Sequence, residues 1–382
     1  MSNNISKVNK ILFILTNLSG GGAEKVLIDI LRHTDFTRYE VDLLLVVKEG
    51  VYLTSVPNDV KIFSLYERRG LKYKLHFALS RYWGLDYFQR SLVQKKIKER
   101  YDTILSFMEG IPLKFHKYLL GCAVKNISWV HTDMEKLHYT LKYFRRGEEN
   151  CLYSKMDDIF IVSECAKEAF VRMFGGNLPL HVLYNPIDRE RICSLAKENK
   201  EIKKTRTTVC SVGRLTYAKC YDRLLRLAKR LKDEKREVDF WLLGIGPLEE
   251  DLKKTASELG VETIVKFLGF QQNPYPYIKS ADLFLSTSMA EGYPLVICEA
   301  LCLEKPIVAT NVTGPREILR DSEYGLLAEE DDESIYKAVC RMLDDNNLRV
   351  HYIEKARERK RDFDIQPVVD KIYKMISLNE CN

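Results

Sequence analysis

Short apolar runs alternate with amphipathic segments along the whole chain, and this alternation restricts the fold more than any other feature of the sequence. Lys10–Thr16 is an apolar run suited to a buried strand, and the glycine-rich Asn17–Gly22 and the helical apolar spacing of Ala23–Arg32 follow it. The same order restarts at Thr208–Val212 in the second half. Repeated strand–helix units in both halves predict an α/β protein with two doubly wound parallel sheets whose strand ends face each other.

The chain has 382 residues, which is long for one domain, so two domains are expected. Asn185-Pro186 is a turn signal between the two series of strand–helix units. We therefore predict a first domain over 1–185, a second over 186–362, and a C-terminal helix in 363–382 that crosses back to the first domain. The further predicted strands are Val41–Val47, Val60–Leu65, Thr103–Phe107, Asn126–Val130, Asp157–Val162, His181–Leu183, Val238–Leu243, Ile264–Leu268 and Pro306–Ala309. The further predicted helices are Cys165–Met173, Leu295–Leu303, Asp332–Leu343, Asn347–Lys360 and Gln366–Ile376.

The composition argues against a membrane-spanning or metal-binding protein. No apolar run reaches the length needed to cross a bilayer, and the apolar core of the first residues is too short for a signal peptide. The ten cysteines lack metal-ligand spacing, and several, such as Cys210, Cys298 and Cys302, lie in apolar runs. We expect reduced, buried cysteines, a cytoplasmic protein, and a reaction without a metal ion.

The stretch EGYPLVICE holds two glutamates eight positions apart, directly after the apolar run ADLFLSTSMA. Glu291 is expected in the loop at the carboxyl end of a strand, Pro294 in the first turn of a helix, and Glu299 about one turn into that helix. The backbone N–H groups of 292–296 surround the helix N-terminus, which favours a phosphate. A nucleotide sugar fits this arrangement, although both glutamates could equally be solvated surface charges.

Other predicted strand ends carry residues suited to the same ligand. Arg214 and Lys219 follow the strand Thr208–Val212, and two cations near a helix N-terminus suit a diphosphate, or are ordinary surface charges. Gly269 and Phe270 follow the next strand but one, where main-chain groups could frame a base. His131 follows the strand Asn126–Val130, at the edge where open α/β sheets bind ligands, although a lone histidine is often structural.

Glycines 20–22 follow the first predicted strand and precede a helix. Three adjacent glycines allow another molecule to approach the backbone closely, and the helix start offers free N–H groups. The alternative is a tight turn without a ligand. The stretch does not match the dinucleotide-binding pattern GxGxxG.

The net charge of +6 is concentrated in the first half, where residues 1–185 hold 27 lysines and arginines against 20 aspartates and glutamates. Residues 67–100 mix six aromatic side chains with ten cations and only three acids. Such a region can lie on an anionic membrane surface, or it can be a solvated basic helix packed on the sheet by its aromatic face. Nucleic acid is not expected as a partner, because no binding module accompanies the charge.

The motifs GGGAEKV, SVGRLTYAKCYDRL and EGYPLVICEALCLEKPIVATNVTGPREI together resemble the retaining glycosyltransferases of family 4, which have the GT-B fold. The resemblance covers nearly the whole chain. Within that family, the sequence is most similar to bacterial transferases that build capsule, exopolysaccharide or lipopolysaccharide chains. It implies two Rossmann-like domains across a cleft. One departure is Cys220, where the family commonly has glycine.

The resemblance implies a role for each matching position. Arg214 and Lys219 would neutralise the diphosphate, Glu291 would bind the donor sugar at the reacting face, and Glu299 would hold the ribose hydroxyls. His131 would lie beside the sugar. Gly21 and Gly22 would approach the phosphates and the acceptor. The residues expected to bring main-chain N–H groups to the sugar and phosphate are Gly292, Tyr293, Pro294 and Leu295.

We therefore expect transfer of a sugar from a nucleotide sugar, with retention at the anomeric carbon. UDP is the expected nucleotide, by analogy with the commonest donors of such transferases. The expected acceptor is a polyprenyl-diphosphate-linked glycan, and the expected location is the cytoplasmic face of the inner membrane. Two other hypotheses are a non-catalytic nucleotide-sugar-binding subunit that activates a partner transferase, and an epimerase or phosphorylase on the same fold.

Overall fold

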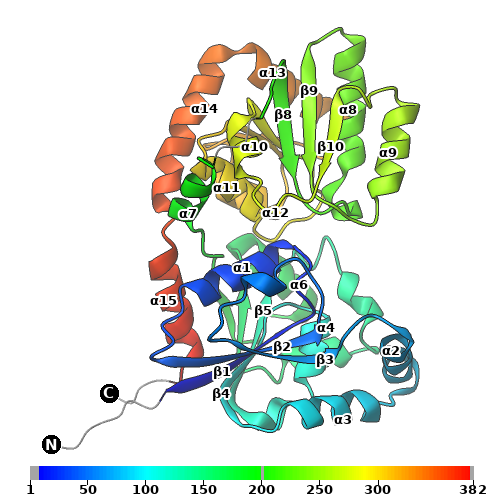
Figure 1. Cartoon of the computed structure of the whole chain (residues 1–382), viewed down its shortest axis with the longest axis vertical. Helices are drawn as coiled ribbons and strands as arrows, with labels where there is room; N and C mark the ends of the chain where they lie inside the picture. Colours follow the sequence, from blue (N-terminus) through cyan, green and yellow to red (C-terminus); the bar gives the residue numbers. More distant parts are fainter. Residues whose placement is uncertain (1–7, 199–201, 379–382) are drawn as a thin grey trace, which may run out of the picture. The chain divides into compact units, whose positions relative to one another are not determined.

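The computed structural model describes residues 8–198 and 202–378, and the chain divides into two compact units (Figure 1). The first unit comprises Met1–Pro186 together with Gln366–Asn382, and the second comprises Ile187–Ile365. The turn signal at Asn185-Pro186 thus lies next to the point where the chain leaves the first unit.

The first unit is built on a seven-stranded parallel sheet with the strand order β3-β2-β1-β4-β5-β6-β7. The apolar runs form its centre, and the side chains of 11–15 in β1 are fully buried, as both faces of a parallel sheet require. The strands are β1 (Asn9–Leu15), β2 (Tyr39–Val47), β3 (Lys61–Tyr66), β4 (Tyr101–Ser106), β5 (Ala123–Val130), β6 (Asp158–Ile161) and β7 (Leu180–Val182). The helices are α1 (Gly22–Arg32), α2 (Leu71–Trp83), α3 (Tyr87–Lys96), α4 (Ile111–His116), α5 (Glu148–Tyr153), α6 (Glu164–Phe174) and α15 (Ile365–Ile376).

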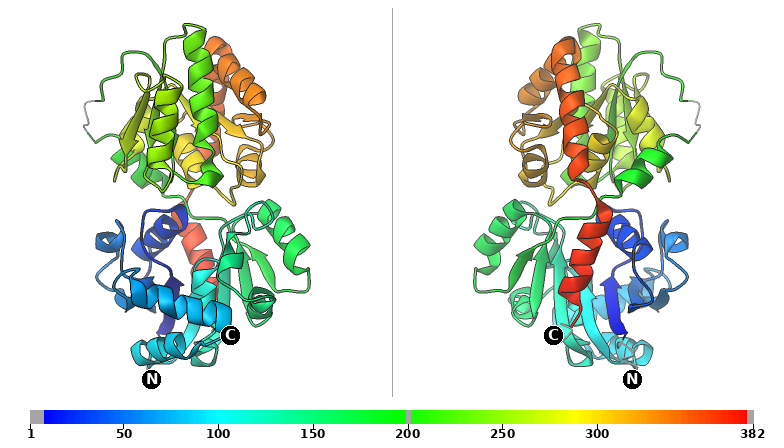
Figure 2. Two further views of the ribbon diagram at one scale, coloured as in Figure 1. Left: turned by 90° about the vertical axis from the view of Figure 1, so that its right-hand side faces the viewer. Right: turned by 90° about the vertical axis from the view of Figure 1, so that its left-hand side faces the viewer.

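The C-terminal helix α15 is held on the first unit by specific contacts (Figure 2). The ring of Tyr373 stacks on that of Tyr39 with centroids 4.4 Å apart, and its hydroxyl is hydrogen-bonded to that of Thr34 at 2.5 Å. The Thr103 hydroxyl donates to the carbonyl of Ile376, and the Lys125 ammonium donates to that of Met375 at 2.7 Å. The last residues of the helix are therefore part of the first unit's core.

The second unit contains a six-stranded parallel sheet with the order β10-β9-β8-β11-β12-β13. Its strands are β8 (Thr207–Val212), β9 (Val238–Leu243), β10 (Val265–Gly269), β11 (Leu283–Ser286), β12 (Ile307–Thr310) and β13 (Leu326–Ala328). Its helices are α7 (Arg189–Leu195), α8 (Tyr221–Asp233), α9 (Glu249–Glu258), α10 (Tyr275–Ser280), α11 (Leu295–Cys302), α12 (Thr313–Leu319), α13 (Asp332–Asp344) and α14 (Asn346–Arg359).

In both sheets the strand order reverses beside the first strand of the unit. Strands β1 and β4 are neighbours in the first unit, and β8 and β11 are neighbours in the second. At such a reversal the two following loops diverge to opposite faces and leave a crevice at the carboxyl ends of the strands, where open α/β sheets bind ligands. The topology therefore marks one edge of each unit before any side chain is considered.

A few local expectations were wrong or incomplete. Strand β13 was not predicted, because LLA is too short for a periodicity to show. Pro294 precedes helix α11 as its N-cap rather than lying in its first turn. None of the nine cysteines that the structure describes is in a disulfide bond, and only Cys210, Cys298 and Cys302 are buried. Among the described residues, no helix is long and apolar enough to cross a bilayer.

Candidate functional site

Hydrogen bonds join the loop after β8 to the loop after β11, on either side of the strand-order reversal. The backbone N–H of Met289 donates to the carbonyl of Ala218 at 2.9 Å, and the Thr287 hydroxyl donates to the carbonyl of Lys219 at 2.9 Å. The guanidinium of Arg223, in helix α8, donates to the carbonyl of Thr287 at 3.2 Å. Two loops about seventy residues apart in the sequence are thereby fixed against each other.

This junction brings Lys219 and Glu291 into an ion pair between Nζ and Oε1. The Ser288 hydroxyl donates to the same carboxylate oxygen at 2.7 Å. Both side chains of the pair remain partly accessible, with 21% of Lys219 and 12% of Glu291 exposed. A lysine and a glutamate are thus placed together, largely desolvated, at the edge where a ligand is expected, and each can turn to an incoming charged or hydroxyl-bearing group.

The start of helix α11 is held by the segment TGPREI. The backbone N–H of Gly314 donates to the carbonyl of Glu291 at 3.0 Å. A Cβ at Gly314 would overlap the Pro294 ring and crowd the carbonyl of Gly292, so only glycine allows this close packing. The backbone of Gly292, Tyr293, Pro294 and Leu295 therefore enters α11 along a fixed path, with Gly292, Pro294 and Leu295 buried and Tyr293 partly exposed.

Glu299 lies in helix α11 and is 3% exposed. The Tyr275 hydroxyl, from helix α10, donates to its Oε1 at 3.4 Å. A carboxylate this deeply buried is uncommon unless it is hydrogen-bonded or serves a ligand. The structure thus separates the two glutamates of EGYPLVICE by environment: Glu291 is accessible and paired with a cation, and Glu299 is buried beside a tyrosine.

The remaining predicted residues of the second unit also lie at the carboxyl ends of strands. Arg214 is two residues beyond β8, and its exposed side chain makes no hydrogen bond or ion pair within the described part of the chain. Gly269 ends β10 with a φ of 64°, accepts a hydrogen bond from the N–H of Gly244 at 2.8 Å, and borders open space. Phe270 follows it and is partly exposed.

In the first unit, His131 directly follows β5 and lies against two aromatic rings. Its ring centroid is 4.9 Å from that of Phe107 and 5.3 Å from that of Trp129. Its backbone N–H donates to Oε2 of Glu109 at 2.9 Å, and the Tyr139 hydroxyl donates to Oε1 of the same residue at 2.8 Å. Neither ring nitrogen has a partner among the described residues, and burial lowers the pKa of His131 to about 3.

The glycine turn after β1 differs from the simple expectation of an open anion site. Gly21 is the N-cap of α1, and Gly22 is the first residue of that helix. The carboxylate of Glu24 folds back over this end, where it would overlap a Cβ at Gly21. A carboxylate is favourable at a helix N-terminus, so Glu24 itself supplies negative charge at this end of α1.

The structure thus places Lys219 and Glu291 in contact. It puts the other predicted residues near strand ends, or within helix α11 for Glu299, without joining all of them directly. Four residues that lie beside the predicted ones were not identified from the sequence. Ser288 and Tyr275 donate to the two glutamates, Glu109 accepts from the backbone of His131, and the Glu24 carboxylate lies against Gly21. Glu109 could have been found, because it comes three residues after the end of β4 at the strand-order reversal. Among the described residues, no group of three His, Cys, Asp or Glu side chains is placed to hold a metal ion.

Comparison with known proteins gives a family model and individual relatives. Residues 194–359 match the family model described as glycosyl transferases group 1. An N-acetylgalactosamine-N,N'-diacetylbacillosaminyl-diphospho-undecaprenol 4-alpha-N-acetylgalactosaminyltransferase of Campylobacter jejuni is 37% identical over 216 residues, which are 56% of this chain and 58% of that relative. The second unit of the chain thus matches the group 1 glycosyltransferases. The region matched by the family model lies within the second unit, which contains Lys219 and Glu291.

Two further similarities extend over nearly the whole chain. A GalNAc-alpha-(1->4)-GalNAc-alpha-(1->3)-diNAcBac-PP-undecaprenol alpha-1,4-N-acetyl-D-galactosaminyltransferase of Campylobacter jejuni is 25% identical over 378 residues, covering 96% of this chain and 98% of the relative. The crystal structure of Anabaena Alr3699/HepE in complex with UDP and glucose matches with a TM-score of 0.76 and 21% identity, over 96% of this chain and 99% of that one. The expected GT-B fold is thereby confirmed.

The departure from the family pattern at Cys220 has a conformational consequence. Cys220 joins the short turn of 217–219 to helix α8 and has φ 48° and ψ 47°, in the left-handed region. A residue with a Cβ is strained there by roughly 1–2 kcal/mol, whereas glycine is not. The glycine that the resemblance implies at this position is thus explained by the backbone, and this chain tolerates a cysteine at a conformational cost.

We expect the free energy of unfolding of Cys220→Gly to lie within about 1 kcal/mol of the wild-type value. Glycine relieves the strained backbone of the folded chain, and this gain offsets the greater freedom that glycine gives the unfolded chain. Cys220→Val should lower the melting temperature in differential scanning calorimetry, because a β-branched residue fits the left-handed region poorly. Cys220→Ala is the control that removes the thiol and keeps a Cβ. A Val variant as stable as the Gly variant would contradict the conformational explanation.

We expect His131 to remain neutral from pH 5 to pH 8, since burial holds its pKa near 3, against about 6.5 in an unfolded chain. Its ring signals in a proton–carbon NMR spectrum, assigned by their loss in His131→Asn, should not move over this range. The lowered pKa of His131 also makes the free energy of unfolding depend on pH. The contribution of His131 to that free energy is complete above pH 6.5 and declines as the pH falls from 6.5 towards 3. A titration midpoint for His131 between pH 5 and pH 8 would show that its ring is solvated.

Proposed function

We propose that this chain is a retaining glycosyltransferase that moves a sugar from a nucleotide sugar, UDP-linked, to a polyprenyl-diphosphate-linked glycan of a bacterial surface polysaccharide. The observation that carries this proposal is the Lys219–Glu291 pair beside the strand-order reversal of the second unit. The relatives named above are transferases whose names include an undecaprenol diphosphate, and the similar Anabaena structure contains UDP. These names support the acceptor and the donor base.

In this proposal Lys219 and Arg214 bind the diphosphate of the donor. As the bond between the anomeric carbon and the phosphate oxygen breaks, negative charge grows on the diphosphate, and fixed cations stabilise that charge most in the transition state. Arg214 is exposed and unpaired within the described residues, and Lys219 has only to exchange Glu291 for a phosphate oxygen. The N–H groups at the start of α11 add to the same field.

Glu291 binds hydroxyl groups of the donor sugar once Lys219 has turned to the diphosphate. The acceptor hydroxyl attacks the anomeric carbon on the face that the diphosphate leaves, and its proton passes to the departing phosphate oxygen. The new carbon–oxygen bond therefore lies on the same face as the old one, which retains the configuration. Glu291 orients and stabilises the sugar in this scheme and forms no covalent bond to it.

The residues of the first unit serve the sugar and the acceptor in this proposal. The ring nitrogens of His131 have no partner among the described residues, so the neutral imidazole can donate to or accept from a sugar hydroxyl. Glu109 holds the backbone of His131 and thereby fixes where the ring lies. For Gly21 and Gly22 to receive a ligand group, the Glu24 carboxylate has to move away from the helix N-terminus or bind that group itself.

We expect Lys219→Ala to lower kcat about 10²- to 10³-fold, the usual loss when one group that stabilises transition-state charge is removed. The pair is mostly buried, so the unfolding free energy of the variant is measured beside kcat to show that the loss of activity belongs to the folded protein. Lys229→Ala is the matched control, because Lys229 forms an exposed ion pair with Asp233 in helix α8. Transfer of a radiolabelled sugar from a UDP-sugar panel measures the effect.

Full activity of Lys219→Ala would remove Lys219 from the mechanism. Slow release of free sugar from the donor by the wild type, absent in Lys219→Ala, identifies an enzyme even when the acceptor is unknown. A wild type that binds UDP but neither transfers nor hydrolyses the donor, alone or with acceptor, would instead favour a non-catalytic nucleotide-sugar-binding subunit.

We expect Glu299→Gln to weaken UDP binding about ten- to a hundredfold, because hydrogen bonds between a carboxylate and the ribose hydroxyls are charge-assisted. The glutamine keeps the shape of the buried side chain and can still accept from Tyr275. Calorimetry with UDP and with 2′,3′-dideoxy-UDP makes the test specific: the wild type should distinguish the two ligands, and the variant should distinguish them far less. Equal discrimination by both proteins would show that Glu299 does not bind the ribose.

A further inference from the structure

Helix α2 of the first unit has two faces with different surroundings. Tyr73, His76, Phe77 and Ser80 recur at the spacing of one helical face, and that face packs inward. The ring of Tyr73 meets that of Tyr66 edge-on at 5.3 Å, and the ring of Phe77 lies 5.7 Å from that of Phe115. The packing of this helix on the sheet is therefore complete without its other face.

The opposite face of α2 is also apolar, although it is exposed. Leu71, Leu75 and Tyr82 share this face and are 83%, 52% and 74% exposed. We call these three residues the outer stripe. Trp83, Leu85 and Tyr87, at the end of α2 and the start of α3, are exposed as well. Seven of the fifteen large apolar side chains that are exposed in the described part of the chain lie within residues 71–88.

Uncompensated positive charge accompanies this apolar surface. Neither α2 nor α3 contains an aspartate or a glutamate. Lys72 and Lys74 flank the outer stripe, and α3 adds further cations. The exposed cations of the two helices that make no ion pair with any described residue are Lys72, Lys74, Arg90, Lys95 and Lys96. An apolar stripe between cations complements an anionic bilayer, where apolar groups enter the interface and cations lie at lipid phosphates.

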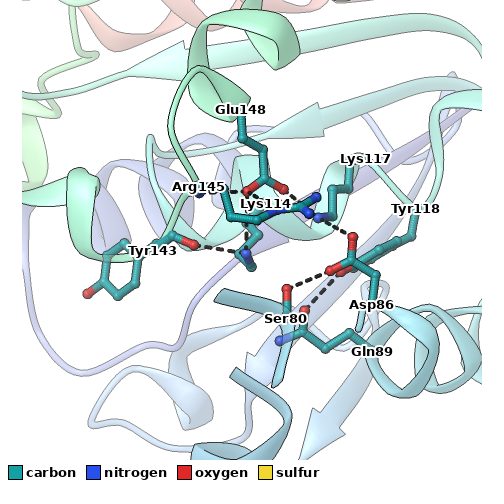
Figure 3. Close-up of polar contacts among 9 residues, drawn as sticks. All are labelled: Ser80, Asp86, Gln89, Lys114, Lys117, Tyr118, Tyr143, Arg145 and Glu148. Atoms are coloured by element: carbon teal, nitrogen blue, oxygen red, sulfur yellow. Dashed lines mark hydrogen bonds and ion pairs between the residues drawn. The ribbon is translucent and has the colours of Figure 1, made fainter. Parts of the chain in front are cut away.

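Helices α2 and α3 and the loop between them form a hairpin, and a largely buried polar cluster fastens this α2–α3 hairpin to the rest of the unit (Figure 3). The Ser80 hydroxyl donates to Asp86 at 2.6 Å, and the Lys117 ammonium donates to Asp86 at 2.8 Å and to Glu148 at 2.6 Å. The Tyr118 hydroxyl donates to Gln89 at 2.9 Å. The end of α2, the connecting loop and the start of α3 are thereby tied to α4 and α5, so the outer stripe is presented on a fixed support.

We propose that the outer face of the α2–α3 hairpin binds an anionic lipid bilayer. The left-hand view of Figure 2 shows α2 on the outside of the first unit, with no other part of that unit in front of it. Tyrosine and tryptophan side chains favour the membrane–water interface, and Tyr82, Trp83 and Tyr87 supply them here. The inference deepens the proposed function, since a polyprenyl-linked acceptor is presented at a membrane, but lipid binding itself is measured without donor or acceptor.

The test uses the full chain and sedimentation with vesicles of phosphatidylcholine, with and without phosphatidylglycerol. We expect binding to the anionic vesicles that weakens as salt rises, and little binding to the neutral ones. Leu71→Ser/Leu75→Ser/Tyr82→Ser should reduce partitioning at least about tenfold. The matched control, Val51→Ser/Val124→Ser/Val350→Ser, removes exposed apolar side chains elsewhere and should bind as the wild type does.

The cations are tested separately. Lys72→Gln/Lys74→Gln should weaken binding about fivefold per lysine, whereas Lys254→Gln/Lys337→Gln, at exposed lysines of the second unit, should not. Tryptophan fluorescence gives an independent measurement, because Trp129 and Trp241 are buried and Trp83 is 68% exposed. Anionic vesicles should shift the emission to the blue in the wild type, and Trp83→Phe should abolish the shift while sedimentation persists.

Absence of binding to anionic vesicles, or equal binding by the stripe variant and the control, would overturn the proposal. A wild type that dimerises in solution and a stripe variant that does not, with no lipid binding by either, would assign this face to contact between two copies. Should the triple variant unfold, Leu71→Ser alone replaces it, since Leu71 is the most exposed of the three. Lys219→Ala should bind vesicles normally, which separates this inference from the proposed reaction.

Discussion

The arrangement of the candidate site depends on one constraint, the reversal of strand order between β8 and β11. Neighbouring strands whose following helices lie on opposite faces cannot share a continuous loop layer, so their loops diverge and leave a crevice. The loops after β8 and β11 are joined at this point by hydrogen bonds from Met289 and Thr287. The Lys219–Glu291 pair is a consequence of that junction, because no local interaction could bring together two side chains so far apart in the sequence.

Several residues around the site are constrained by the backbone rather than by chemistry. Gly314 is required because Pro294 and Gly292 leave no space for a Cβ. Cys220 adopts a left-handed conformation that suits glycine better. The close approach of the loops at these positions strains or crowds the backbone. The packing of the buried strands β8 and β11 offsets this cost. The charged residues can then be held with part of their surface free for a ligand.

The first unit also has residues at the carboxyl ends of its strands, and in addition it has an exposed apolar surface on helix α2. His131 and Glu109 lie at the carboxyl ends of β5 and β4, whereas the outer stripe of α2 faces away from the core. The earlier alternatives for residues 67–100 were a membrane-binding region and a helix packed by its aromatic face. The structure divides the aromatic residues between the two: Tyr73 and Phe77 pack inward, and Tyr82, Trp83 and Tyr87 are exposed.

The sequence by itself determined the α/β class, the positions of most strands, and which loops carry Glu291, Lys219, Arg214 and His131. It could do so because apolar periodicity and turn residues are local properties of the chain. Only the tertiary structure decided that Lys219 contacts Glu291, that Tyr275 reaches the buried Glu299, and that Glu24 covers the helix start at Gly21. These contacts follow from strand order and packing, which join residues distant in sequence and leave no periodic signal in it.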